Sequence, residues 1–339
     1  MIPYTKLRST NRQNLMDILP LKMPFTVLIE PSSLCNFRCI QCFQSLKQET
    51  YFSHNRRNMD LGLYQKVIMQ LRDWGRQIKV LKISLYGEPL CNPYFGEMLR
   101  LAKSANIAER IETTTNASLL SEQVAAGMIE HQLDYIRVSI YSPHQLKHER
   151  ITRTSTQINS IHENLRVLQE MKRHAGSERP FVAVKMIDTY GPDNDTFFQM
   201  YRDVADEMYI DKPHNWIRTS PAKFTDILYK DNAAKAAEDI KASSEQRFAC
   251  PMPFTTLAVR SNGDVSPCCV DFIGGTNLGS VKDKTLKELW TSDAWHNFLI
   301  MQLQNQKHEN SSCARCEFFK SSYYIKDTID GFDVNRLRL

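Results

Sequence analysis

Between residues 25 and 215, short apolar segments alternate with amphipathic ones. The apolar segments are rich in Val, Ile and Tyr and end in polar or turn residues, as buried strands do. They are FTVLIEPS, VLKISLYG, RIETTTN, YIRVSIYS, FVAVKMID and EMYIDKPH. The amphipathic segments between them have helical spacing; one begins after Asp60, a plausible N-cap, and another begins at Ile158. Six such alternations predict a parallel sheet with right-handed crossovers, either open or part of a β/α barrel.

Polar sequences end or follow the first five predicted strands. CNFRCIQC comes after the first strand, YGEP ends the second, TTTN the third, SIYS the fourth and KMID the fifth. In both candidate folds, the loops at the carboxyl ends of the strands form the active edge. We therefore expect these polar sequences to gather on one rim.

The character of the chain changes beyond about residue 247. FTTLAVRSNGDVSPCCV alternates around an Asn-Gly turn, which predicts a hairpin. A capping box, Thr285 to Glu288, starts a helical segment. We expect a partial (β/α)6 TIM-like barrel followed by a small α+β domain, with this division: extension 1–24, barrel 25–220, polar alanine-rich helical linker 221–247, small domain 248–320 and tail 321–339.

The overall composition is that of an ordinary globular protein, with 42% hydrophobic and 24% charged residues among 339. No apolar run could cross a bilayer, and the N-terminal residues contain no apolar signal-peptide region, so we expect a cytoplasmic protein. The net charge of +5 is spread along the chain. The brief basic sequence HNRRNMD is better interpreted as a solvated loop than as a nucleic-acid patch, since it lacks interleaved aromatic residues.

The cysteines indicate metal sites. Nine cysteines in a reducing compartment point to metal binding rather than disulfides, and eight of them fall into two groups. Cys35, Cys39 and Cys42 form the first group. A structural zinc site needs four ligands, and no fourth Cys or CxxH pattern accompanies these three. A [4Fe–4S] cluster held by three thiolates fits better and leaves one iron open to another ligand.

The sequence CNFRCIQC resembles the CxxxCxxC signature of radical S-adenosylmethionine (SAM) enzymes, which have a partial β/α barrel. The resemblance implies that SAM chelates the open iron through its amine and carboxylate. An electron then cleaves the sulfonium to a 5′-deoxyadenosyl radical, which abstracts hydrogen from the substrate. The family often has an aromatic residue before the third cysteine; this chain has Gln41 there and Phe43 just after it.

The same resemblance extends to candidate SAM-binding residues. YGEP is similar to the GGEP motif, which contacts the SAM amino group, and TTTN lies where polar side chains meet the ribose or carboxylate. SIYS lies where a ribose-binding hydroxyl is common, and ERITR contains an arginine like one that pairs with the SAM carboxylate. For each of the residues outside YGEP, a structural role stays open. The candidates are Tyr86, Gly87, Glu88, Pro89, Thr115, Asn116, Ser139 and Arg153.

The second group of cysteines is similar to the twitch domain, a shortened SPASM domain with one auxiliary [4Fe–4S] cluster. The resemblance implies two clusters in all. The expected auxiliary ligands are Cys250, Cys268, Cys313 and Cys316. A four-cysteine zinc site is the competing interpretation, because spacing alone does not separate the two metals.

Three further cysteine and cavity assignments stay open. Cys269 is a buried structural thiol, a ligand in place of Cys268, or a hydrogen-atom donor to a substrate radical, as in some related epimerases. Cys91 is expected to pack rather than to bind metal. His214, Asn215 and Trp216, after the sixth strand, are candidates to line a substrate cavity.

The resemblance implies mechanism more closely than substrate. Related twitch enzymes act on aminocyclitols and sugars, so we expect hydrogen abstraction from a carbinol C–H of a sugar-like small molecule, with a flavodoxin or ferredoxin as electron donor. Epimerisation follows if Cys269 donates hydrogen, and a ketone follows if the auxiliary cluster accepts an electron. A peptide maturase is a third possibility, weakened because no N-terminal winged-helix extension for leader-peptide capture is seen. The non-enzymatic alternative is a zinc-stabilised binding module.

Overall fold

The computed structural model describes residues 12–45, 56–212, 232, 234–235, 247–272, 274–316, 318–320 and 325–337. The six predicted strands are all confirmed as β1 to β6, and two more strands follow in the C-terminal part. The strands are β1 (Thr26–Ile29), β2 (Ile78–Ile83), β3 (Ala108–Thr115), β4 (Tyr135–Ile140), β5 (Phe181–Ile187), β6 (Glu207–Asp211), β7 (Thr256–Val259) and β8 (Val265–Ser266).

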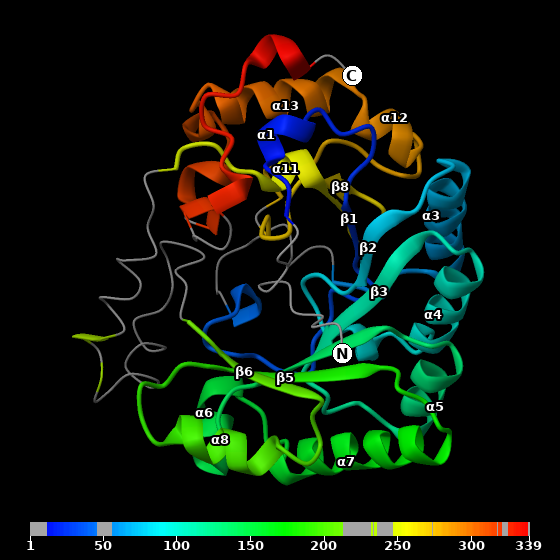
Figure 1. Cartoon of the computed structure of the whole chain (residues 1–339), viewed down its shortest axis with the longest axis vertical. Helices are drawn as coiled ribbons and strands as arrows, with labels where there is room; N and C mark the ends of the chain where they lie inside the picture. The colour runs from blue at the N-terminus through cyan, green and yellow to red at the C-terminus, as the bar shows by residue number, and fades with distance from the viewer. Residues whose placement is uncertain are drawn as a thin grey trace.

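Within the described residues, the strands form one eight-stranded sheet in the order β6-β5-β4-β3-β2-β1-β7-β8. Strands β1 to β6 are parallel throughout, with Val27 opposite Leu81 of β2. The sheet curves as a partial barrel (Figure 1). All the carboxyl ends of β1 to β6 therefore meet at one edge, as the sequence predicted, and the expected α/β fold class is confirmed.

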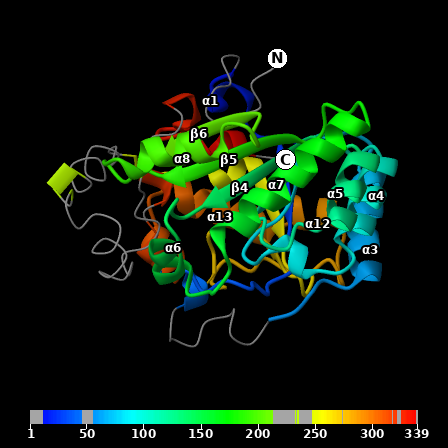
Figure 2. The same ribbon diagram turned by 90° about the horizontal axis from the view of Figure 1, so that it is seen from below.

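The helices between the strands cover the convex face of the sheet (Figures 1 and 2). Asp60 caps the first of them as expected, since its carboxylate accepts a hydrogen bond from Leu63 N. The helices are α1 (Leu15–Ile18), α3 (Leu61–Asp73), α4 (Phe95–Ser104), α5 (Glu122–Glu130), α6 (Gln145–Thr152), α7 (Ile158–His174), α8 (Asp193–Tyr201), α11 (Met252–Thr255), α12 (Leu286–Trp290) and α13 (Asp293–Leu303).

Short 3-10 turns occur after some strands and across the C-terminal part. They are η1 (Phe43–Ser45), η2 (Pro89–Cys91), η3 (Lys307–Glu309), η4 (Cys313–Arg315), η5 (Phe318–Lys320), η6 (Ile325–Asp327) and η7 (Val334–Leu337). Two of them, η1 and η2, begin within or next to the polar sequences singled out above, and η4 begins at Cys313 of the second group of cysteines.

The C-terminal part extends the barrel sheet. The hairpin forms about Asn262-Gly263, where Gly263 has a φ of +94°, and the capping box of Thr285 and Glu288 is also confirmed. Strand β7 pairs in parallel with β1, so the edge of β1 is covered rather than exposed. One cluster of buried apolar side chains runs from Val27 to Trp295 through both parts. The predicted domain limits stay predictions, but the two parts share a sheet and a core.

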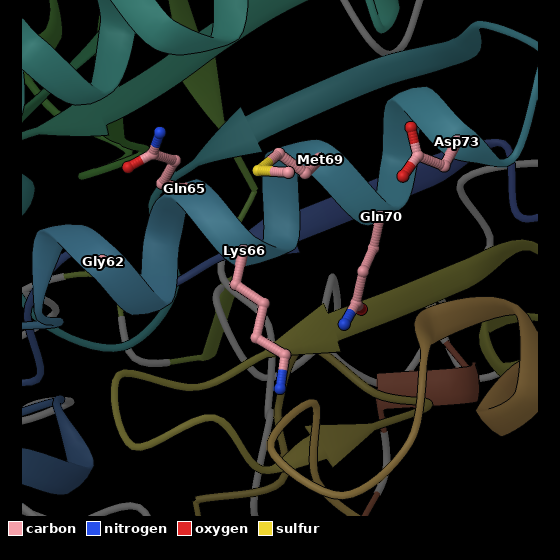
Figure 3. Close-up of a pocket in the computed structure, with 6 residues that line it drawn as sticks. All are labelled: Gly62, Gln65, Lys66, Met69, Gln70 and Asp73. Atoms are coloured by element: carbon pink, nitrogen blue, oxygen red, sulfur yellow. The ribbon is translucent and has the colours of Figure 1, made fainter.

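Helix α3 also contacts the C-terminal part. Lys66 Nζ donates to the carbonyl of Lys282, and Leu286 N donates to Gln70 Oε1, each at 3.1 Å. Figure 3 shows Lys66 and Gln70 on one side of α3 and Gln65 and Met69 on the other. An open groove of about 350 Å³ follows this helix and is lined by none of the predicted site residues.

Two predicted features concern residues that the structure does not describe. His214, Asn215 and Trp216 lie outside the described residues, and so does most of the linker predicted at 221–247. In the part of the chain that is described, every helix is too short or too polar to cross a bilayer.

Candidate functional site: two groups of cysteines

The loop from Cys35 to Cys42 follows β1 at the carboxyl edge of the sheet. Its backbone is anchored on the end of α6, because Arg38 N donates to Thr152 O at 2.9 Å and Ile40 N donates to Ile151 O at 2.8 Å. Within the loop, Cys42 N donates to Cys39 O at 2.9 Å. The loop is therefore held by main-chain bonds to a helix more than a hundred residues away.

Each sulfur of this loop accepts a hydrogen bond. Phe37 N lies 3.4 Å from Cys35 Sγ, the backbone of Gln44 donates to Cys42, and the Tyr141 hydroxyl bonds Cys39.

Burial raises the pKa of all three thiols, to about 12 for Cys35 and about 11 for Cys42. Three thiols whose ionisation is opposed by their surroundings suit a cationic iron–sulfur core, which would compensate the thiolate charge.

Gly87 brings the glutamate motif against the segment that connects β1 to the cysteine loop. A Cβ at this position would lie 2.2 Å from Ser32 O and 2.4 Å from Leu34 O, so only glycine fits. The next residue continues the contact, since Glu88 N donates to Leu34 O at 2.8 Å. Glycine is therefore required at position 87 because two backbone segments approach each other closely there.

The Glu88 carboxylate is buried and joins the second and third strand ends. It accepts hydrogen bonds from Thr115 Oγ1 at 2.5 Å, Asn116 N at 2.8 Å and Leu90 N at 3.2 Å. Burial raises the pKa of Glu88 to about 7 against the lowering effect of these bonds. The amide of Asn116 in turn donates to Asn36 Oδ1 at 3.0 Å, inside the cysteine loop. The structure thus connects three of the predicted polar sequences.

Two predicted residues lie further along the rim. Ser139 is half-buried on β4, opposite Lys185 of β5. Arg153 ends α6 in the left-handed conformation, with a φ of +52°, directly after the residue that anchors Arg38. Cys91 is half-buried in η2, and the Asn36 backbone donates to it, so it lies against the cysteine loop.

The second group of cysteines surrounds a cavity. The side chains that line it include Cys250, Cys268, Cys313 and Cys316, whereas Cys269 is not among the described residues lining it. Cys269 nevertheless lies close enough to influence the pKa of Cys316 and of Tyr86, the first residue of YGEP. Cys268 influences the pKa of Tyr86 as well, so both adjacent thiols lie near the YGEP segment. The strand β8 ends at Ser266, so both adjacent thiols are on the loop that follows it.

All four cavity sulfurs accept N–H hydrogen bonds. Three donors are backbone amides two residues ahead: that of Met252 for Cys250, Val270 N at 3.3 Å for Cys268 and Phe318 N at 3.4 Å for Cys316. The fourth is a side chain, because Gln302 Nε2 lies 3.5 Å from Cys313 Sγ. Burial raises the pKa of these thiols, to about 11 for Cys313.

Asp271 holds the cysteine-bearing segments together. Its carboxylate lies 2.5 Å from Arg260 Nη2, and both side chains are at most 2% exposed. It also accepts from Thr276 N at 3.0 Å and from the hydroxyl of Ser312, the residue before Cys313. Removing this carboxylate would leave a buried guanidinium without its ion-pair partner.

A buried lysine lines the same cavity. Lys307 is 8% exposed, and its ammonium lies over the ring of Phe319. Burial lowers its pKa to about 8, while the charges of Cys250, Cys313 and Cys316 act in the opposite direction.

Aromatic side chains connect the two groups of cysteines. Phe43, next to Cys42, stacks on Phe272 with ring centroids 5.2 Å apart and lies edge-on to Tyr86 at 5.4 Å. Sequence reasoning missed Tyr141, Gln302 and Lys307 as well as this stack. Tyr141 lies within SIYS, in which the sequence comparison pointed only to Ser139. Gln302 and Lys307 belong to no motif, and an isolated Gln or Lys carries no signal until the fold brings it to the cysteines.

Among the described residues, no three Cys, His, Asp or Glu side chains converge on a common point as ligands of one ion would. The four thiolates of a [4Fe–4S] cluster each bind a different iron, so their sulfurs stand further apart.

The chain matches two family models. Residues 29–198 match the radical SAM superfamily, and residues 250–317 match the SPASM iron–sulfur cluster-binding domain. The first match covers the barrel with Cys35, Cys39 and Cys42, and the second covers the four cavity cysteines. Together these domains imply SAM and iron–sulfur clusters as cofactors.

Two proteins with similar sequences match most of the chain. A tungsten-containing aldehyde ferredoxin oxidoreductase cofactor-modifying protein of Pyrococcus furiosus is 20% identical over 336 residues, covering 88% of this chain and 89% of its own. The S-adenosyl-L-methionine-dependent 2-deoxy-scyllo-inosamine dehydrogenase of Niallia circulans is 21% identical over 292 residues, covering 85% and 90%.

A solved structure agrees in fold. The crystal structure of BtrN in complex with AdoMet and 2-DOIA superposes with a TM-score of 0.54 at 15% identity, covering 89% of this chain and 98% of that one. The chain is a radical SAM enzyme: it belongs to the radical SAM superfamily and carries a C-terminal SPASM domain.

Proposed function

We propose that this enzyme abstracts hydrogen from a carbinol C–H of a sugar- or aminocyclitol-like substrate and inverts that carbon, with Cys269 as the hydrogen donor. The position of Cys269 carries the proposal. It is not among the described residues that line the C-terminal cavity, whereas four other thiols are, and like Cys268 it lies near Tyr86 on the rim. A thiol in this position is available for chemistry other than metal binding.

Cys35, Cys39 and Cys42 would hold a [4Fe–4S] cluster, and Cys250, Cys268, Cys313 and Cys316 would hold a second one. With SAM bound, the first cluster supplies the electron that cleaves the sulfonium and yields the 5′-deoxyadenosyl radical.

The residues of the rim would bind and orient SAM. The backbone of Tyr86, Gly87 and Pro89 would meet its amino group, and Glu88 keeps this segment in place through Thr115 and Asn116. Ser139 would bind the ribose.

Arg153 would pair with the SAM carboxylate. Its left-handed conformation directly after the α6 anchor supports this role, because the anchor keeps it beside the cysteine loop.

Cys269 would then return a hydrogen atom to the substrate carbon from the face opposite the abstraction. The S–H bond breaks and a C–H bond forms, so the carbon is inverted and a thiyl radical is left. Restoring the thiol takes one electron and one proton, for which we propose an external flavodoxin or ferredoxin as the electron source.

Dehydrogenation is the second candidate, and the relatives favour it. A protein named as a 2-deoxy-scyllo-inosamine dehydrogenase is similar along 85% of this chain. In that case, after hydrogen abstraction, the substrate radical would lose its hydroxyl proton to a base and one electron to the auxiliary cluster. The product is a ketone, and Cys269 takes no part.

Replacing Cys269 by alanine or serine separates the two candidates. For an epimerase, both variants still form 5′-deoxyadenosine but lose inversion, and the deuterium that wild-type enzyme incorporates from D₂O at the inverted carbon disappears. Serine keeps the size of the side chain, but its O–H bond is too strong to donate hydrogen. For a dehydrogenase, both variants form the ketone at close to the wild-type rate.

The preparation itself tests the cofactor assignment. Anaerobically purified protein should be brown and contain about eight irons per chain, as two cubane clusters require. A colourless protein rich in zinc would overturn the proposal. Turnover of peptides and not of sugars would show that the substrate is a peptide.

A further inference from the structure

The C-terminal cavity contains a cation that no hydrogen bond explains. The Lys307 ammonium is buried, and among the described residues it has no hydrogen-bond partner. Burying a lysine in this way is costly unless a nearby negative charge compensates it. The charged groups around it are Cys250, Cys313, Cys316 and, more weakly, Asp330. Three of these four are thiols of the cavity.

Asp330 is already engaged elsewhere. Its two carboxylate oxygens accept from the backbone amides of Phe248 and Ala249 at 3.1 and 2.9 Å. The thiols therefore remain as the main anionic partners that Lys307 could have, provided that they are ionised.

Gln302 adds a second donor that faces the thiols. It is fully buried on α13, and it supplies the N–H group for Cys313 that the backbone supplies for the other three sulfurs. Gln302 and Lys307 come from different elements, α13 and η3, and both line the cavity.

A positive charge and an N–H hydrogen bond near a cluster both stabilise its more negative, reduced form. Net charge, hydrogen bonds to the sulfurs and solvent exposure are the features that set the potentials of these clusters. In a buried site, the charge acts through little solvent and is weakly screened.

We propose that Lys307, assisted by Gln302, raises the reduction potential of the cluster held by Cys250, Cys268, Cys313 and Cys316. The inference rests on the proposed function in requiring that cluster. Lys307 would act on the cluster through its positive charge and not as a ligand, since an ammonium has no lone pair to give to iron.

The test is an EPR-monitored redox titration of the intact holoenzyme, with and without SAM. SAM perturbs the signal of the cluster at Cys35, Cys39 and Cys42, which identifies the other signal as the auxiliary one. The variants are Lys307→Met, Lys307→Arg and Gln302→Leu. The matched control is Lys287→Met, which removes an exposed lysine of α12 in the same part of the chain.

Lys307→Met should lower the auxiliary midpoint potential, with about a tenfold change in the one-electron equilibrium, or about 59 mV. Gln302→Leu should shift it in the same direction by less. Lys307→Arg, which keeps the charge, and Lys287→Met should both stay near the wild-type value, and the SAM-sensitive signal should not move in any variant.

The two possible failures are distinguishable. Wild-type protein that has only the SAM-sensitive signal and about four irons would refute the auxiliary cluster, and with it the proposed function. Two signals with an unchanged auxiliary potential in both Lys307→Met and Gln302→Leu would overturn this inference alone. An equal shift in Lys287→Met would also overturn it, because the effect would then be one of overall charge. If Lys307→Met does not fold, Gln302→Leu decides the outcome.

Discussion

The two groups of cysteines are alike in how their sulfurs are bonded and different in what surrounds them. In both, most sulfurs accept a backbone amide two residues ahead, and one sulfur takes its hydrogen bond from a side chain, Tyr141 in the loop and Gln302 in the cavity. Around the loop stand the polar ends of parallel strands, whereas the cavity has a fourth thiol and a buried lysine. Under the proposed function, the loop would leave one coordination position open to SAM, whereas the cavity would supply all four ligands of its cluster.

The two groups of cysteines also differ in the contacts that hold them in place. The three thiols of the loop lie within eight residues, so a few main-chain bonds to α6 suffice to hold them. The cavity thiols span residues 250 to 316, and Asp271 ties their segments together through Arg260, Thr276 and Ser312. Cysteines that are far apart in the sequence need contacts between distant segments to hold them together, because loop-closure entropy opposes their assembly.

Removing one thiol from each site should have the largest effect and should separate the two roles. Cys39→Ala should reduce 5′-deoxyadenosine formation to background and abolish the spectral change on adding SAM. Cys313→Ala should keep that spectral change. Each variant should contain about half of the wild-type iron, measured by colorimetric assay. A SAM response in Cys39→Ala would contradict the assignment of the open site to the loop.

Breaking the tie at Asp271 should have the next largest effect. Asp271→Asn leaves the guanidinium of Arg260 buried without its counter-charge, which should lower the free energy of unfolding by about 3–5 kcal/mol. The variant should lose iron from the C-terminal cavity while it still binds SAM. Denaturant unfolding measures the effect, with Asp283→Asn on the exposed surface as control. A loss equal to that of the control would show that the buried pair is not needed.

The contact between the two regions should have the smallest effect. The stack of Phe43 on Phe272 should contribute an interaction energy of about 0.5–1.5 kcal/mol in a double-mutant cycle with leucine at each position. Additive losses in the cycle would mean that the loop and the cavity segment are stabilised independently. The cycle thus measures how far the two sites act as one unit.

Much of this could be predicted because it is local. The six strands of the barrel, the cap at Asp60 and the capping box at Thr285 follow from periodicity and short-range hydrogen bonding, which neighbouring residues decide. The pairing of β7 with β1 could not be predicted, since a short apolar hairpin carries no information about which free edge it will cover. The need for glycine at position 87 could not be predicted either, because the backbone that it contacts is more than fifty residues away in the sequence.

By itself the sequence determined the donor chemistry: three thiols within eight residues, five more spread from residue 250 to 316, and polar residues at five strand ends. Spacing and residue type are sufficient for that, because ligand chemistry belongs to the side chain. Only the tertiary structure separated Cys269 from Cys268 and placed Lys307 beside the cavity. Which thiol faces a cavity, and which charge is buried next to it, depend on packing between distant segments.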